Sequence, residues 1–202
     1  MLYIVRHGET AKNKQKLLQG RSDFPLNEKG RDQAAQVGQM LGARGITVDS
    51  IYTSPLVRAV ETAQLIAHGM GADDALVNVE NRLIEMDYGP YEGMSLEDPA
   101  PEVMAFFMDF AGTPAPDGME QLHSVVARLG EFLEDIKEEA RTSDVLLSAH
   151  AISMKGALEY LTPDSNGSYW STNIGNCEVY EVEVSDDGYG IPHPLLKLKG
   201  SV

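Results

Sequence analysis

The chain has 202 residues, which suits about one domain with its own hydrophobic core, and we expect a single domain over residues 1–202. Its net charge of −15 argues against nucleic acid or an anionic membrane surface as a partner. Its one cysteine, Cys177, allows neither an intramolecular disulfide nor a cysteine-rich metal cluster, so we expect a reducing, cytoplasmic compartment.

The first predicted element is a strand over residues 2–5. The run LYIV is apolar, too short for a helix and rich in β-branched and aromatic side chains, which indicates a strand buried on both faces. Met1 leads into it without a basic segment or a long apolar run, so we expect neither a signal peptide nor a membrane span. Arg6 and His7 follow where this strand ends.

Helices and strands alternate along the chain after this point. Residues 27–45 predict a helix that begins at an Asn27 cap and stops at Gly45. The later predicted elements are a strand within 49–55, a helix over 56–67, one long helix over 118–140 and a buried strand over 145–149. This alternation predicts an α/β fold: a three-layer α/β/α sandwich with a mostly parallel central sheet.

The C-terminal run CEVYEVEV, residues 177–184, alternates apolar and acidic residues but slips phase at Tyr180. The slip predicts a strand with a bulge. We also expect this strand to lie at an edge of the sheet, which leaves a homodimer open. The Pro- and Gly-bearing stretches 98–118 and 186–194 are interpreted as excursions from the same domain, and a cap-like insertion is expected around 94–118.

Two histidines and two arginines fall at the ends of predicted strands or just beyond them. Ligands in open α/β sheets bind at the carboxyl ends of the parallel strands, where Arg6, His7, Arg58 and His150 would meet. Two guanidinium groups suit a phosphoryl oxyanion, and a histidine beside them stays neutral and able to attack phosphorus. Taken singly, each histidine is more often a hydrogen-bonded structural residue, but the four together favour an anion site. The balance of +4 over residues 1–60, against −19 over the rest, agrees with an early anion site.

Five sequence blocks resemble one known family. They are RHGET at 6–10 with Asn13 behind it, QGRSDFPLNEKGRDQA at 19–34, YTSPLVRAVETA at 52–63, RLIEMDYGPYEG at 82–93 and SAH at 148–150. In their order and spacing over roughly residues 1–160 they are similar to the histidine phosphatase superfamily, also called the phosphoglycerate mutase-like family, and we expect its phosphatase branch.

The resemblance implies a role for each matching residue. His7 would be the nucleophile that becomes phosphohistidine, and Glu85 the acid and base. The fixed cationic side chains would supply the positive charge that phosphoryl transfer needs, so no cofactor and no metal is implied. The remaining implied contacts to phosphate or substrate are Arg6, Arg58, His150, Asn13, Gln19, Gly20 and Ala151.

The chain departs from the family pattern in three places. Ala151 stands where glycine usually follows the second histidine, and its methyl group narrows the approach to the phosphate. Lys12 replaces the tryptophan that many mutases have before the asparagine. GME at 118–120 replaces the more usual GES, so no role is carried over from that serine.

Residues 94–118 contain no Lys or Arg, and they carry an apolar cluster that would cover a leaving group of modest polarity: Met104, Phe106, Phe107, Met108 and Phe110. We therefore expect a metal-independent phosphomonoesterase acting on a small phosphorylated metabolite. The alternative within the family is a cofactor-dependent phosphoglycerate mutase, with its missing cations supplied by Lys12, Lys14, Lys16 or Arg21. A non-catalytic phosphate-binding regulatory module is a second alternative, disfavoured because binding alone needs no proton donor such as Glu85. A Rossmann-type nucleotide enzyme fits poorly, since no glycine-rich fingerprint follows the first strand.

Overall fold

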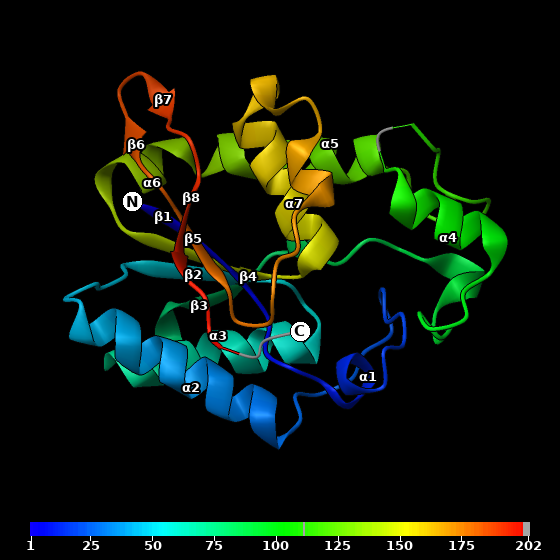
Figure 1. Cartoon of the computed structure of the whole chain (residues 1–202). Helices are drawn as coiled ribbons and strands as arrows, with labels where there is room; N and C mark the ends of the chain where they lie inside the picture. Colours follow the sequence, from blue (N-terminus) through cyan, green and yellow to red (C-terminus); the bar gives the residue numbers. More distant parts are fainter. Residues whose placement is uncertain (111, 200–202) are drawn as a thin grey trace.

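A computed structural model of the chain describes residues 1–110 and 112–199 (Figure 1). Ala111 and residues 200–202, which fall within the predicted insertion and the predicted domain, lie outside the described residues. The central sheet has six strands in the order β3-β2-β4-β1-β5-β8. Their bounds are β1 (Leu2–Arg6), β2 (Ser50–Thr53), β3 (Val77–Val79), β4 (Val145–Ala149), β5 (Val179–Val182) and β8 (His193–Leu196).

The sheet is mostly parallel, as the sequence predicts. Strands β1, β2, β3 and β4 pair in parallel, whereas β5 is antiparallel to both β1 and β8. A separate two-stranded ribbon joins β6 (Val184–Ser185) to β7 (Gly188–Tyr189). The four parallel strands direct their carboxyl ends to one rim, which is where this class of sheet binds ligands.

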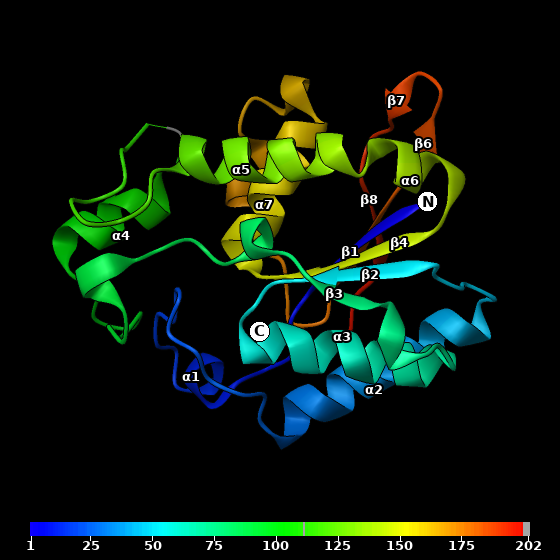
Figure 2. The ribbon, with the colours of Figure 1, turned by 180° about the vertical axis from the view of Figure 1, so that it is seen from behind.

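Helices cover both faces of the sheet and complete the predicted three layers (Figures 1 and 2). One face carries α2 (Glu28–Ala43) and α3 (Val57–Met70); the other carries α5 (Leu122–Asp135), α6 (Lys137–Thr142) and α7 (Ala151–Leu161). The short helices α1 (Ala11–Lys14) and α4 (Pro101–Met108) lie beyond the end of β1 (Figure 1). Short 3₁₀ turns are η1 (Asp74–Leu76), η2 (Asn81–Leu83), η3 (Gly89–Tyr91), η4 (Pro163–Ser165) and η5 (Ser168–Ser171). None of the helices in the described part of the chain combines the length and apolar character that crossing a membrane requires.

Strand β1 is buried on both faces, which confirms the interpretation of LYIV. Leu2 and Ile4 belong to the core cluster beneath α5 and α7, while Tyr3 and Val5 belong to the cluster beneath α2 and α3. This division follows the two-residue period of a strand. Because each fully buried apolar side chain contributes roughly 1.5–3 kcal/mol, β1 is held firmly between the layers, and so is the residue that follows it.

The prediction of one helix over 118–140 is wrong at the start of that range and at Ile136, where the helix is interrupted. Gly118 has a φ of +89°, which no helix accommodates, and the helix begins only after the Gln121 cap. At Ile136 the backbone has φ −95° and ψ 1°, and this turn separates α5 from α6. Ile136 and Ala140 nevertheless belong to the same buried cluster, so the apolar residues remain buried on both sides of the turn.

The C-terminal strand also differs from expectation in part. The bulge predicted at Tyr180 is confirmed, because the register of β5 against β8 shifts between Val179 and Tyr180. The expectation of a sheet edge is wrong, since β5 lies between β1 and β8. The alternation within CEVYEVEV could not show that β8, which begins only at His193, pairs with the second edge of β5.

Candidate active site

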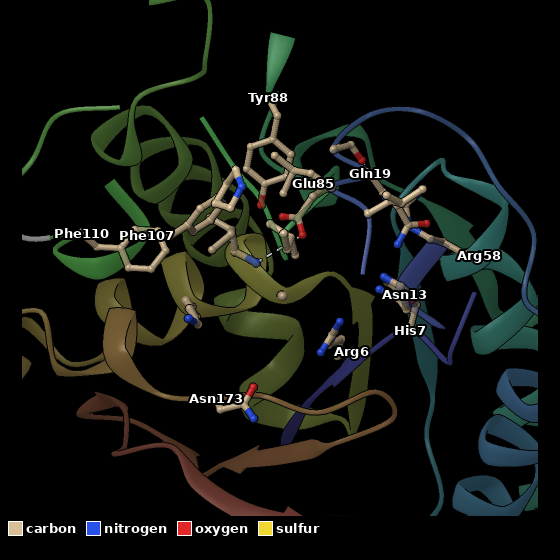
Figure 3. Close-up of a pocket in the computed structure, with 18 of the residues that line it drawn as sticks. Arg6, His7, Asn13, Gln19, Arg58, Glu85, Tyr88, Phe107, Phe110 and Asn173 are labelled. Carbon is tan, nitrogen blue, oxygen red and sulfur yellow. Dashed lines mark hydrogen bonds between the residues drawn. The ribbon is translucent and has the colours of Figure 1, made fainter. Parts of the chain in front are cut away.

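A pocket of about 430 Å³ opens at the rim where the parallel strands end. Figure 3 shows Arg58, His7 and Asn13 on one side of it, Phe107 and Phe110 on the other, and Glu85 and Tyr88 between them. Its lining brings together all of the predicted site residues except His150, namely Arg6, His7, Asn13, Gln19, Gly20, Arg58, Glu85 and Ala151.

His7 follows directly on β1, and its ring has a defined tautomer. Nδ1 lies 2.7 Å from the carbonyl oxygen of Gly8, which can only accept, so Nδ1 carries the proton and Nε2 keeps its lone pair. The side chain is buried, and burial together with the charges of Arg58 and Arg6 holds the pKa of His7 well below its usual value. The imidazole is therefore neutral at physiological pH and nucleophilic at Nε2.

The backbone around His7 is fixed by close contacts. Asn176 Nδ2 donates to the His7 carbonyl oxygen at 3.0 Å, and the Gly8 amide donates to Thr62 Oγ1 at 3.0 Å. A Cβ on Gly8 would lie 2.4 Å from the carbonyl oxygen of Gly30, in the first turn of α2. The glycines of RHG and NEKG thus allow two backbones to approach more closely than any side chain permits.

Arg58 stands in the first turn of α3 and is almost fully buried. Nε donates to His150 Nδ1 at 3.2 Å, while the two terminal nitrogens donate to the carbonyl oxygens of Ser22 at 2.8 Å and Gly20 at 2.7 Å. Three of its five N–H groups are used in this way, and the others remain for a ligand. A guanidinium held by three acceptors binds an anion without losing further side-chain freedom.

His150 follows directly on β4 and lies behind the pocket rather than in its lining, as far as the described residues show. Because its Nδ1 accepts from Arg58, Nε2 carries the proton and donates to Ser54 Oγ at 2.7 Å. The His7 and His150 ring centroids are 5.1 Å apart. The pKa of His150 lies well below its usual value, mainly because the ring is buried and secondly because of the charge of Arg58. In this structure His150 supports Arg58, and direct contact with phosphate stays a prediction.

Glu85 reaches the pocket from the segment between η2 and η3. One carboxylate oxygen accepts from the amides of Met86 at 2.9 Å and Ser153 at 3.0 Å, and the other from Ile152 at 3.3 Å. Two of these donors belong to the first turn of α7, where negative charge is stabilised. Tyr88, which the sequence analysis did not single out, lines the pocket beside Glu85, and burial raises its pKa well above the usual value.

The amide side chains of Asn13 and Gln19 are both oriented by Thr10. The Thr10 backbone amide donates to Asn13 Oδ1 at 3.1 Å, and the Thr10 hydroxyl group donates its one proton to Gln19 Oε1 at 2.9 Å. With both carbonyl oxygens turned to Thr10, the NH₂ groups are left for the pocket that both residues line. Each side chain can therefore donate to an oxyanion.

The cations that the sequence analysis suggested as substitutes do not line the pocket. Lys12 Nζ lies over the Phe24 ring, Lys14 and Lys16 line a separate hollow, and Arg21 contacts Asp87 and Glu120. The Glu120 of GME is thus engaged in ion pairs rather than free for a substrate.

Lys155 is a cation in the pocket lining that the sequence analysis missed. The helical period could have identified it, because Lys155 follows Ala151 by four residues and therefore lies on the same face of α7. The described residues contain no group of three or more His, Cys, Asp or Glu side chains that could hold a metal ion.

Comparisons with known proteins agree with this geometry. The family model described as "Histidine phosphatase superfamily (branch 1)" matches residues 2–193. A probable phosphoglycerate mutase GpmB from Salmonella arizonae is 35% identical over 100% of this chain and 93% of its own length. A solved mycobacterial glucosyl-3-phosphoglycerate phosphatase has a TM-score of 0.78 and 27% identity, covering 90% of this chain and 92% of its own.

A second solved structure adds support for the fold. Phosphoserine phosphatase from Entamoeba histolytica, in complex with 3-phosphoglyceric acid, has a TM-score of 0.81 and 24% identity, covering 98% of this chain and 97% of its own. Proteins named as mutases and as phosphatases therefore share this fold with the chain.

Proposed function

Since the chain belongs to branch 1 of the histidine phosphatase superfamily, we propose that it hydrolyses small phosphomonoesters through a phosphohistidine formed on His7. The observation that carries the proposal is the His7 tautomer: Nδ1–H is committed to the Gly8 carbonyl, and Nε2 keeps its lone pair in a pocket lined by Arg6 and Arg58. A neutral nucleophile beside two fixed positive charges suits attack on a phosphate dianion.

The first chemical step transfers the phosphoryl group. His7 Nε2 forms a bond to phosphorus as the bond to the ester oxygen breaks, and the developing charge on the phosphoryl oxygens is stabilised by Arg6, Arg58 and the Asn13 amide. The departing alkoxide takes a proton from Glu85, which enters this step as the neutral acid. The alcohol leaves, and a phosphohistidine and an ionised Glu85 remain.

The second step returns the enzyme to its starting state. A water molecule in the place of the alcohol gives a proton to Glu85 and attacks phosphorus, and the bond from phosphorus to His7 Nε2 breaks. Inorganic phosphate leaves, with His7 neutral and Glu85 protonated as before the first step. The backbone amides of Met86, Ile152 and Ser153 hold the carboxyl group in place for both proton transfers.

The pocket supports hydrolysis over mutase chemistry. We propose residues 94–118 as a cap on a single domain. The described residues of this stretch contribute only apolar side chains to the lining: Leu96, Pro99, Met104, Phe107 and Phe110. A bisphosphorylated intermediate would need further cationic groups there. The mutase activity named for the GpmB relative remains the second candidate, favoured by the sequence identity and by Lys155.

The test is release of inorganic phosphate from a panel of phosphomonoesters in EDTA, with 3-phosphoglycerate assayed in parallel for isomerisation. We expect release that survives chelation and is lost in His7→Ala, together with an acid-labile label on the wild-type chain. His68→Ala is a matched control, because His68 is an exposed histidine of α3 outside the pocket.

Other outcomes would replace the proposal. Isomerisation without net phosphate release would make the protein a mutase. Phosphate or vanadate binding by folded protein, with neither activity, would make it a binding module. Phosphate release that continues in His7→Ala would show that His7 is not the nucleophile.

A further inference from the structure

Lys155 lies in the pocket wall beside Phe110, and its charge is influenced by Glu85 and Arg6. It follows Ala151 and Ile152 by one helical turn on α7, and all three line the pocket. Lys155 Nζ donates to the Trp170 carbonyl oxygen at 2.8 Å and lies 5.2 Å from the centroid of the Phe110 ring. Since Phe110 stands on the opposite side from Arg58 and His7 (Figure 3), the ammonium group lies across the pocket from these two residues.

Lys155 differs from four other lysines of the described residues, because no carboxylate lies close to its charge. Lys16, Lys29, Lys137 and Lys197 each lie within 4 Å of a carboxylate, whereas among the described residues none is that close to Lys155 Nζ. Glu85, the carboxylate that most influences it, is held by three backbone amides. Burial lowers the pKa of Lys155 to about 8. In a chain with 31 acidic residues, a partly buried ammonium without an acidic neighbour points to an anion from outside the chain.

Apolar side chains make up much of the pocket lining, beside the polar groups of Glu85, Tyr88 and Asn173. Phe107 and Phe110 form one side, and Leu96, Pro99 and Met104 continue it. The pocket, at about 430 Å³, is of the size that holds a small organic molecule rather than phosphate alone. One ammonium with two unused N–H groups matches a carboxylate, whereas a second phosphate dianion would leave excess negative charge.

We propose that Lys155 determines specificity by pairing with a carboxylate on the alcohol part of the substrate. The preferred substrates are then phosphomonoesters in which an apolar body of about the size of an aromatic ring separates the phosphate from a carboxylate. This assignment rests on the proposed function, because it takes the pocket to be the site of ester binding.

The test compares two esters that differ in charge but hardly in shape, 4-carboxyphenyl phosphate and 4-carbamoylphenyl phosphate. Wild type should prefer the carboxylate in kcat/KM by about 10- to 100-fold, the range of a charge-assisted hydrogen bond. Lys155→Met should bring the ratio close to one, and Lys155→Arg should retain part of the preference. A merely structural role would lower both values of kcat/KM and leave their ratio unchanged.

Lys137→Met is the matched control, since Lys137 is also partly buried but lies outside the pocket and pairs with Glu134. It should keep the wild-type ratio. The preference should also shrink above pH 8, because the free ammonium loses its proton there. Equal kcat/KM for the two esters in wild type, or an unchanged ratio in Lys155→Met, would overturn the assignment.

A binding measurement separates this inference from the proposed reaction. Calorimetry with 4-carboxybenzylphosphonate and 4-carbamoylbenzylphosphonate, which cannot be hydrolysed, should show the same preference in wild type and its loss in Lys155→Met. If phosphate release fails but this preference appears, the hydrolysis is wrong and the role of Lys155 holds. If the two phosphonates bind with equal affinity, the proposed role of Lys155 is wrong, whether or not the protein hydrolyses phosphomonoesters.

Discussion

Arg58 Nε donates a hydrogen bond of 3.2 Å to His150 Nδ1, so the guanidinium and the imidazole are positioned as one unit. Arg58 comes from α3 and His150 from the end of β4, and both are buried. Ser54 accepts from the far side of the imidazole and completes the chain of contacts. The orientation of the Arg58 guanidinium therefore depends on a histidine that does not belong to the described pocket lining.

Removing His150 should weaken anion binding through Arg58. We expect His150→Ala to lower kcat/KM, and the affinity for vanadate, by about 10²–10³-fold, the range for losing one oriented donor to a phosphoryl group. Ser54→Ala should cost only about 10-fold, because the imidazole keeps its contact with Arg58. Steady-state kinetics and vanadate inhibition measure both effects; equal losses in the two variants would contradict the support role.

The ring of His7 should remain neutral in mildly acidic solution. Burial, Arg58 and Arg6 hold its pKa well below 6.5. ¹⁵N NMR of the imidazole should show a protonated Nδ1 and an unprotonated Nε2 throughout pH 6–8, a range set by the usual pKa of about 6.5. A protonated Nε2 near neutral pH would be incompatible with nucleophilic attack by this nitrogen.

The two buried histidines should also make stability depend on pH. Both have lowered pKa values in the folded state, so below pH 6.5 the unfolded chain binds protons that the folded chain does not. The free energy of unfolding should therefore fall as the pH drops through 6.5, and be recovered above it. Urea unfolding between about pH 5 and 8, a range that brackets the usual histidine pKa, measures this slope. It should be shallower in His7→Gln, and an unchanged slope would argue against a neutral His7.

The close approach of α2 to the RHG loop should make Gly30 sensitive to substitution. A Cβ on Gly30 would lie 2.0 Å from the Glu9 carbonyl oxygen, so Gly30→Ala should cost about 1–3 kcal/mol of unfolding free energy and lower activity by displacing the loop. Gly42 lies in the same helix, where a Cβ would meet its nearest neighbour at 3.4 Å. Gly42→Ala should stabilise by about 0.5–1 kcal/mol, since alanine favours the helix. Similar effects of the two substitutions in chemical denaturation would refute the close-approach explanation.

Asn176 should hold the backbone of His7. It is fully buried, donates to the His7 carbonyl oxygen at 3.0 Å, and its Oδ1 has no hydrogen-bond partner among the described residues. Asn176→Asp keeps the shape but directs a carboxylate at that carbonyl, and should cost about 1–3 kcal/mol or more in stability and most of kcat. Asn176→Ala should be milder. Unfolding and kinetic measurements on both variants test this order, and the reverse order would show that Asn176 only fills space.

Sequence patterns were sufficient where a structure depends on neighbours along the chain. LYIV and VLLSA are short apolar runs, and such runs become buried strands whatever lies beyond them. The Asn27 cap of α2 is equally local, because its side chain accepts from the Gly30 amide three residues later. The topological rule for parallel strands then placed Arg6, His7 and Arg58 at one rim.

The sheet edge was mispredicted because a distant strand decides it, and the long helix because its interruption leaves no mark in the apolar period. Whether β5 is an edge depends on the pairing with β8, which the alternation within CEVYEVEV does not encode. The turn at Ile136 interrupts a regular apolar period. The sequence there contains neither glycine nor proline, the residues that usually indicate a helix break.

The fold class, the family and most of the residues that line the candidate site could be predicted from the amino-acid order, because strand ends and short motifs are local properties. The support of Arg58 by His150 from behind, and the presence of Lys155 rather than Lys12 or Arg21 in the pocket lining, became visible only in the folded chain. Hydrogen-bond direction and burial depend on groups from several elements at once. The sequence specifies which residues are charged, whereas packing determines which surface each charged side chain faces.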